Sequence, residues 1–417
     1  MADNLSYLKK LLAQKQTRSG LRYRHYEMKS HPQDLFSTAE LKAWNLRPVL
    51  GWCSKAVDTL ADRMQFKGWK NDNFDLETIF RMNNWDIFFD SAILSALING
   101  CSFVYISEDE TGFPRLEVID GMNATGIIDP VTNLLKEGYA ILERDKNGTP
   151  VREAYFETGR TTFYEKGQEP YEVLNQAPTP LLVPVLYRPD AKRPFGHSRI
   201  SRAMMSLVDS AVRTTKRSEV AAEFYSVPQK YVLGTDPDAE ALDKWKSTIS
   251  SLMEISKDED GDRPTVGQFT QQSMQPHMDQ IRTFAALFAG ESGLTMDDLG
   301  FVSDNPSSAE AIKASHESLR VLAEKAQRVF GSCFLNIGYI SACLRDNFPY
   351  QRRQFYLTEP VWRPAFKPDA AALSGIGDGA IKLNQAVPGY FNKDNLTDLT
   401  GIDPSEMEIP PNVFAQL

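Results

Sequence analysis

The sequence lacks the residue patterns on which most enzymatic and metal sites depend. Its four cysteines show no Cys-x-x-Cys spacing, and neither a Gly-x4-Gly-Lys-Ser/Thr loop nor a His-Glu-x-x-His motif occurs. The longest apolar region, residues 87–106, contains Asp90, Asn99 and Gly100, which indicates a buried helix followed by a strand rather than a membrane span. We therefore expect reduced thiols of a cytosolic setting, no catalytic, cofactor or metal site, and no membrane contact.

The composition is that of an ordinary globular protein with an acidic surface. The 417 residues are 42% hydrophobic and 24% charged, which allows two or three domains with a sizeable core. The formal net charge is −9. Affinity for DNA comes from Lys and Arg neutralising phosphates, so this chain is a poor candidate for gripping DNA, although DNA could slide along it. No secretion signal is visible, and residues 1–12 are typical of a short amphipathic helix.

Apolar residues in the first part of the chain recur at the spacing of a helix. Residues 44–64 and residues 76–99 carry apolar side chains at helical intervals, and Gly100 suits the end of the second helix. A strand is expected to follow directly, over residues 102–106. The first 110 residues are therefore predicted to be mainly helical.

The next part of the chain carries strand patterns up to Tyr187. Turn signals separate its strand-like runs, and Asn147-Gly148 indicates the clearest hairpin. Closely spaced prolines between Pro178 and Pro194 predict an extended linker. An α+β domain of about 190 residues is therefore expected to precede a more helical part.

Helices dominate the second half. The last of them is the longest, about 60 Å at 1.5 Å per residue, and it could break near Gly331 or Gly338. A helix of this length indicates an elongated subunit packed beside copies of itself. The expected helices cover residues 198–225, 237–255, 277–289 and 306–345.

An acidic segment precedes the longest helix. Asp297, Asp298 and Asp304 could hold magnesium for a nuclease, because carboxylates are the ligands that Mg²⁺ prefers. Their position before a helix start capped by Asn305 favours a negatively charged, mobile loop instead. The structural interpretation is the stronger of the two.

The order of several motifs resembles the portal proteins of long-tailed bacteriophages. Leu299-Gly300 is followed by Asn305-Pro-Ser-Ser-Ala-Glu-Ala-Ile312 and then by a long Leu- and Ala-rich helix. The resemblance covers most of residues 185–400 and rests on order and spacing rather than on one invariant motif. Its other carriers are Pro194–Arg202, Pro228–Gly234, Trp362-Arg-Pro, Asp378–Leu383 and Pro388-Gly389.

This resemblance implies an α+β fold in which a mixed wing domain precedes long stem helices, with a small α/β clip and a helical crown. The implied segments are a wing-like α+β domain (residues 1–195), a first stem helix (196–226), a clip-like α/β excursion (227–276), a second stem helix (277–290), a tunnel loop (291–305), a long helix (306–345) and a tail forming the crown and the return to the wing (346–417).

The same resemblance implies a structural function without catalysis. Portal subunits form a closed head-to-tail ring, usually a dodecamer, at one capsid vertex, through which double-stranded DNA is packaged and ejected. The implied partners are a terminase that supplies the energy, the major capsid or scaffold protein, and a head-tail adaptor. The protein would be made in the host cytoplasm and reside in the virion.

Two groups of residues are candidates for the site on this resemblance. The loop carrying Asp297, Asp298, Gly300 and Asp304 is the candidate constriction nearest to DNA. The bases of the first stem helix could contact phosphates or form ion pairs with a neighbouring stem, and the second interpretation is slightly favoured. These bases are Arg199, Arg202, Arg213, Lys216 and Arg217.

Two rival interpretations remain at the level of sequence. One is a different structural head protein, such as an adaptor or scaffold, that never meets DNA. The other is a metal-dependent nuclease that uses the aspartates around Asp297.

Overall fold

The structure is a computed structural model that describes residues 2–33, 46–226, 230–233, 265–268, 273–301, 314–368 and 370–402. The chain forms two compact units. The larger unit comprises residues 1–27, 53–201 and 305–417, and the smaller unit comprises residues 28–52 and 202–304. Helices and strands are mixed along the chain, which confirms the α+β class. The division into seven segments stays a prediction.

A five-stranded antiparallel sheet occupies the larger unit. Its strands follow one another in chain order, so each connection is a short turn. The predicted hairpin at Asn147-Gly148 joins the second and third strands, with Gly148 at φ +79°, a conformation that glycine adopts without strain. The strands are β4 (Ala124–Ile128), β5 (Leu135–Arg144), β6 (Pro150–Glu157), β7 (Arg160–Glu165) and β8 (Tyr171–Leu174).

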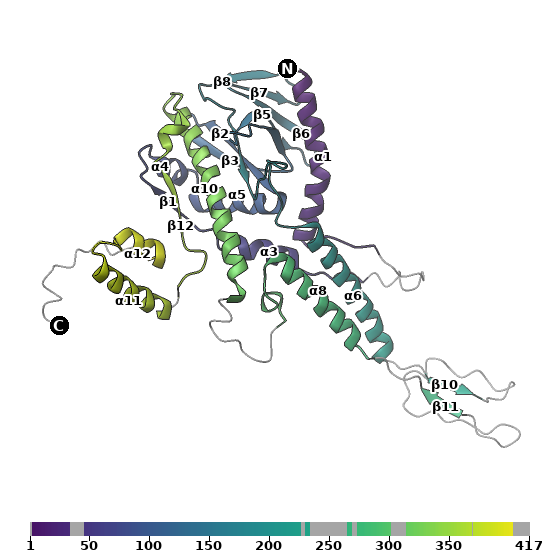
Figure 1. Cartoon of the computed structure of the whole chain (residues 1–417). Helices are drawn as coiled ribbons and strands as arrows, with labels where there is room; N and C mark the ends of the chain where they lie inside the picture. Colours follow the sequence, from purple (N-terminus) through teal and green to yellow (C-terminus); the bar gives the residue numbers. More distant parts are fainter. Residues whose placement is uncertain are drawn as a thin grey trace, which may run out of the picture. The chain divides into compact units, whose positions relative to one another are not determined.

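The first helix covers part of this sheet. Helix α1 (Ala2–Tyr26) runs along one side of it (Figure 1) and is longer than the predicted helix of twelve residues. Leu8 and Leu12 of α1 are buried in one cluster with Tyr139 and Tyr155 of the sheet. Hydrophobic burial along one face of the helix therefore fixes α1 to the sheet.

A second sheet has three strands in the order β3-β2-β9, namely β3 (Pro114–Asp120), β2 (Cys101–Glu108) and β9 (Leu182–Leu186). The linker predicted from Pro178 to Pro194 is wrong, because its middle is the buried strand β9. Pro184 lies opposite Phe103 of β2, on the outer strand of the sheet, where a residue without an N–H is tolerated. The Leu186 N–H is directed to the Cys333 thiol sulfur at 3.4 Å.

Helices pack against the three-stranded sheet. They include α5 (Trp85–Asn99) and α10 (Glu317–Arg345). Helix α5 ends at Gly100 with φ +98°, as predicted, but the helix predicted over residues 76–99 is interrupted before Trp85. The Asn83 side chain there donates to Pro114 O and accepts from the Leu116 N–H, both at 2.9 Å. These bonds to β3 separate α5 from α4 (Leu76–Arg81).

Helix α10 is continuous through both of its glycines, so neither predicted break occurs. An added Cβ at Gly331 would lie 2.5 Å from Pro360 Cγ, and one at Gly338 would lie 2.8 Å from Leu76 Cδ1. The glycines therefore allow close packing. Residues 306–313, where this helix was predicted to begin, lie outside the described residues.

The larger unit also contains a pair of strands and further helices. Helix α3 (Trp52–Ala61) is the described part of the helix predicted over residues 44–64, although its first residue belongs to the smaller unit. Strand β1 (Phe66–Lys70) pairs with β12 (Glu359–Trp362). The 3₁₀ turn η2 (Arg352–Phe355) precedes β12, and helices α11 (Ala370–Ala386) and α12 (Lys393–Thr400) follow it.

The smaller unit is built on two helices, α6 (Arg202–Ser226) and α8 (Gln275–Ser292). Between them in the chain, strands β10 (Lys230–Leu233) and β11 (Thr265–Gln268) form an antiparallel pair. The 3₁₀ turn η1 (Asp297–Leu299) follows α8. The helix predicted over residues 237–255 lies outside the described residues.

Candidate functional site

The paired helices α6 and α8 form the framework of the candidate site. They lie alongside each other, with the C-terminal end of α6 close in space to the N-terminal end of α8 (Figure 1). Ala211 of α6 and Phe288 of α8 are fully buried, and Thr214 Oγ1 lies 3.1 Å from Gln280 Oε1. Apolar packing with one polar contact thus fixes the two helices together.

Aromatic contacts anchor the end of α8. The Phe288 ring lies 5.6 Å from the Trp52 ring, which in turn lies 6.4 Å from the Phe301 ring. Trp52 lies within the helix predicted over residues 44–64, but its contact with Phe288 was not predicted. A large aromatic residue at the start of a helix is the feature that could have predicted this contact, because its ring can pack against another element of the fold.

The structure divides the five bases predicted for the first stem helix. Arg199 is not on this helix, because α6 begins three residues later. Arg199 belongs to the larger unit and is only 6% exposed, with its Nε donating to Ala56 O at 3.3 Å. Its guanidinium is thus held by the fold, and its assignment to the stem helix is wrong.

The other four bases lie on α6 with unequal exposure. Arg202 is exposed, Arg213 and Arg217 are half-buried, and Lys216 is only 8% exposed. Arg213 donates to Ser210 Oγ at 2.9 Å. At 100° per residue, these four bases fall within one stripe about 100° wide along the helix.

The tunnel loop was predicted over residues 291–305, but its first two residues are the end of α8, which is followed by Gly293 with φ +70°. Asp298 accepts hydrogen bonds from the N–H and the hydroxyl of Thr295, both at 2.9 Å, so its carboxylate stabilises the turn η1. Asp297 is exposed, and Gly300 closes the turn with φ +89°. Asp304 lies outside the described residues, so the structure does not test whether it joins the other two aspartates.

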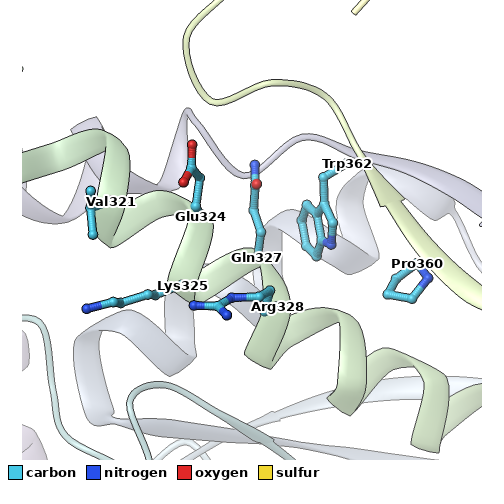
Figure 2. A pocket seen from close by; sticks show the side chains of 7 residues that line it. All are labelled: Val321, Glu324, Lys325, Gln327, Arg328, Pro360 and Trp362. Carbon is cyan, nitrogen blue, oxygen red and sulfur yellow. The ribbon is translucent and has the colours of Figure 1, made fainter. Parts of the chain in front are cut away.

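A pocket of about 540 Å³ lies in the larger unit between α10 and β12. Figure 2 shows Pro360 and Trp362 on one side of it, with Lys325 and Arg328 of α10 extending in the same direction. No serine, threonine, cysteine or histidine is among its described lining residues, which are completed by Val321, Glu324 and Gln327.

The described residues offer little for catalysis. Burial raises the pKa of Cys101, Cys333 and Cys343 to about 11, which keeps these thiols protonated at neutral pH. Within the described part of the chain, no three His, Cys, Asp or Glu side chains gather so as to hold a metal ion. None of the helices described is long and apolar enough to cross a membrane.

Comparison with known proteins defines the class. The family model for phage portal proteins of the SPP1 Gp6-like type matches residues 7–350. The portal proteins of Mycobacterium phages L5 and D29 are each 26% identical to this chain, over 87% of it and 80% of their own lengths. A chain from the virion of a native gene transfer agent particle shares 12% identity at a TM-score of 0.48, over 93% of this chain and all of that chain.

The match to the family model covers most of the chain, and the class it defines is that of structural proteins of the phage particle rather than enzymes. The chain belongs to the phage portal proteins, SPP1 Gp6-like, which confirms the resemblance drawn from its motifs. A portal protein is part of the connector between head and tail, so family membership decides against the nuclease alternative.

Proposed function

We propose that copies of this chain assemble head to tail into a closed ring, a dodecamer, at one capsid vertex, and that double-stranded DNA passes through its bore during packaging and ejection. Family membership is the single observation that carries this proposal. The ring provides the docking site for a terminase, for the major capsid or scaffold protein and for a head-tail adaptor. The terminase supplies the energy, because no nucleotide-binding loop occurs in the sequence.

The charge of the chain supports a path along which DNA slides. Twelve copies at −9 each carry a formal charge of −108. A protein that makes 6–10 phosphate contacts changes its DNA affinity by about 10³–10⁵-fold over modest salt changes, so many bases would hold the duplex in place. An acidic ring with few available bases favours weak, replaceable contacts.

The exposure of the charged residues on α6 and α8 supports the same point. Arg202 and Arg282 are the exposed bases among the side chains described on these helices. Exposed acids outnumber them, because Glu219, Asp279 and Glu291 are also on the surface. The half-buried bases Arg213 and Arg217 are better suited to ion pairs within or between subunits than to contacts with a moving duplex.

The constriction of the bore is proposed to include the loop around Asp297, Asp298 and Gly300, together with Asp304. Asp297 supplies exposed negative charge there, whereas Asp298 maintains the shape of the turn. A negative constriction repels the phosphates of the duplex and keeps its contacts short-lived. The assembled protein resides in the virion after synthesis in the host cytoplasm.

Electron microscopy and native mass spectrometry of the purified protein test the ring. We expect an annular particle with an axial hole wide enough for duplex DNA, and a mass near twelve times 46.9 kDa. A compact monomer under all assembly conditions refutes the proposal. Rings without such a hole favour an adaptor or scaffold protein that never meets DNA.

A packaging assay tests the loop. We expect Asp297→Lys to slow DNA translocation, because the added base would bind phosphates in the bore. Asp378→Lys is the matched control, since Asp378 is an exposed aspartate of α11 and not part of the proposed constriction loop. Equal effects of the two substitutions would show that net charge matters and the loop does not.

A further inference from the structure

A groove of about 730 Å³ lies between α1 and the outer strands of the five-stranded sheet. Helix α1 packs over β4 and β5 and forms one wall of the groove, whereas β6, β7 and β8 supply its floor. Tyr155, Thr162 and Glu172 lie side by side across these three strands, each on a different one. All of the described lining residues belong to the larger unit, so the groove is formed within one compact part of the chain.

Strand β8 forms the open edge of this sheet, near the N-terminal end of α1 (Figure 1). Its four residues are exposed, and no strand in the described part of the chain pairs with its outer side. The Asn175 N–H, just after β8, donates to Gly159 O at 3.0 Å. Because hydrogen-bonded pairs alternate along an antiparallel ladder, the N–H and C=O groups of Glu172 and Leu174 are directed away from β7. These groups can pair with another extended chain.

The side chains of this edge strand are apolar apart from Glu172. Leu174 is 76% exposed, Val173 is 47% exposed and Tyr171 is 39% exposed. Side chains alternate along a strand, so Leu174 lies on the groove side with Glu172, and the other two lie on the opposite face. Exposed apolar side chains beside an unpaired strand edge are typical of a site that another chain covers.

The groove contains one base outside its ion pairs. Lys10 of α1 is exposed and forms no ion pair within the described residues. The other bases of the groove are held in the pairs Lys9–Glu153, Arg160–Glu157 and Arg160–Glu172. The rings of Tyr155 and Tyr164 give the floor an apolar surface. A ligand that matches this groove therefore combines an apolar side chain with a carboxylate that reaches Lys10.

We propose that β8 and this groove bind an extended segment of a partner protein, which adds to the sheet as a further strand. Its backbone pairs with Glu172 and Leu174, an apolar side chain enters the groove, and a carboxylate meets Lys10. Pairing of β8 with the β8 of a second copy would involve only four residues a side, whereas stable interfaces use about 20–30. The site lies within one chain, so the proposal does not depend on the ring.

Binding of a synthetic peptide to the full-length protein tests the site. A fluorescein-labelled peptide of sequence Thr-Leu-Val-Asp-Val-Thr-Thr places its leucine and aspartate on one face of an extended chain and both valines on the other. Fluorescence anisotropy should show saturable binding, and hydrogen exchange over residues 171–174 should slow when the peptide is bound. The same peptide with its central backbone nitrogens methylated is the matched control. It should not bind, because it lacks the N–H groups that pair with a strand edge.

Two substitutions test the parts of the site. Leu174→Pro removes an outward N–H but no bond to β7, and proline is tolerated at such a position of an edge strand. It should weaken peptide binding by about tenfold or more, whereas Leu174→Ala, which keeps the N–H, should weaken it clearly less. Lys10→Gln should weaken binding by about two- to fivefold. Arg18→Gln, at an exposed base of α1 outside the groove, should leave it unchanged.

Two results would overturn the proposal. The first is an absence of saturable binding, or equal binding of the peptide and its N-methylated form, which would mean that the backbone of β8 pairs with no added strand. The second is a change in the association of copies caused by Leu174→Pro without peptide, which would assign the edge to a second copy. The N-methylated peptide and Lys10→Gln keep the test decisive if Leu174→Pro does not fold.

Discussion

One methyl group at position 331 tests how α10 packs in the larger unit. Helix propensity alone predicts that Gly331→Ala stabilises the protein by about 0.8–1.0 kcal/mol, since alanine is the better helix former. The surroundings oppose this gain. A Cβ at this position would lie 2.5 Å from Pro360 Cγ, 2.9 Å from Pro360 Cβ and 3.2 Å from Trp362 Nε1.

The geometry decides which effect is larger. Carbon atoms in contact lie about 3.5–4.0 Å apart, so the Pro360 ring would have to move by roughly 1 Å. This ring lies against α10 (Figure 2), and its strand pairs with β1, where Pro360 is opposite Trp69. Overpacking of this kind costs about 1–3 kcal/mol. We therefore expect Gly331→Ala to lower the free energy of unfolding by about 1 kcal/mol.

Gly375→Ala in α11 is the matched control. Gly375 is also inside a helix, but no atom lies within 4 Å of its added Cβ, so the helix gains the full benefit of alanine. Urea unfolding followed by tryptophan fluorescence, together with hydrogen exchange of the α10 and α11 amides, measures both variants. A Gly331→Ala variant as stable as the wild type or more stable would refute the packing argument.

Three further predictions concern the larger unit. Leu8→Ala should lower the free energy of unfolding by about 2–5 kcal/mol because Leu8 of α1 is fully buried against the five-stranded sheet, whereas Tyr7→Ala, at a side chain that is 55% exposed, should change it little. Urea titration compares the two variants, and equal effects would contradict the docking of α1. Burial raises the pKa of Asp120, so the folded state holds this proton to higher pH than the unfolded state, and the free energy of unfolding falls as pH rises from about 4 through the raised pKa. The stability of Asp120→Asn relative to the wild type should therefore increase over that pH range in urea titrations. A constant difference would show that the Asp120 carboxyl does not cause the pH dependence. Arg199→Gln should lower the melting temperature without changing DNA passage, because Arg199 is buried and donates to Ala56 O, whereas Arg202→Gln should leave the melting temperature unchanged. Differential scanning fluorimetry and the packaging assay test this. A defect in DNA passage with normal stability in Arg199→Gln would show that Arg199 acts in the channel.

The candidate site was only partly accessible to sequence analysis. Four of its five bases lie on one helix as expected, because apolar spacing and charge pattern along a helix are local properties. Their exposure was not predictable, since Arg213 and Lys216 line a cavity together with residues 46–48, which are distant from them in sequence. The acidic composition of the loop also did not indicate that Asp298 would accept hydrogen bonds within the turn.

The sequence by itself determined features that depend on neighbours along the chain. The Asn147-Gly148 turn and the helix end at Gly100 follow from the backbone freedom of glycine, and the order of motifs was sufficient to assign the portal family. Only the tertiary structure decided that the proline-rich segment contains the buried strand β9 and that Arg199 is held beneath the surface. Both outcomes depend on partners distant in sequence, β2 for the strand and Ala56 for the arginine, and local patterns carry no information about such pairings.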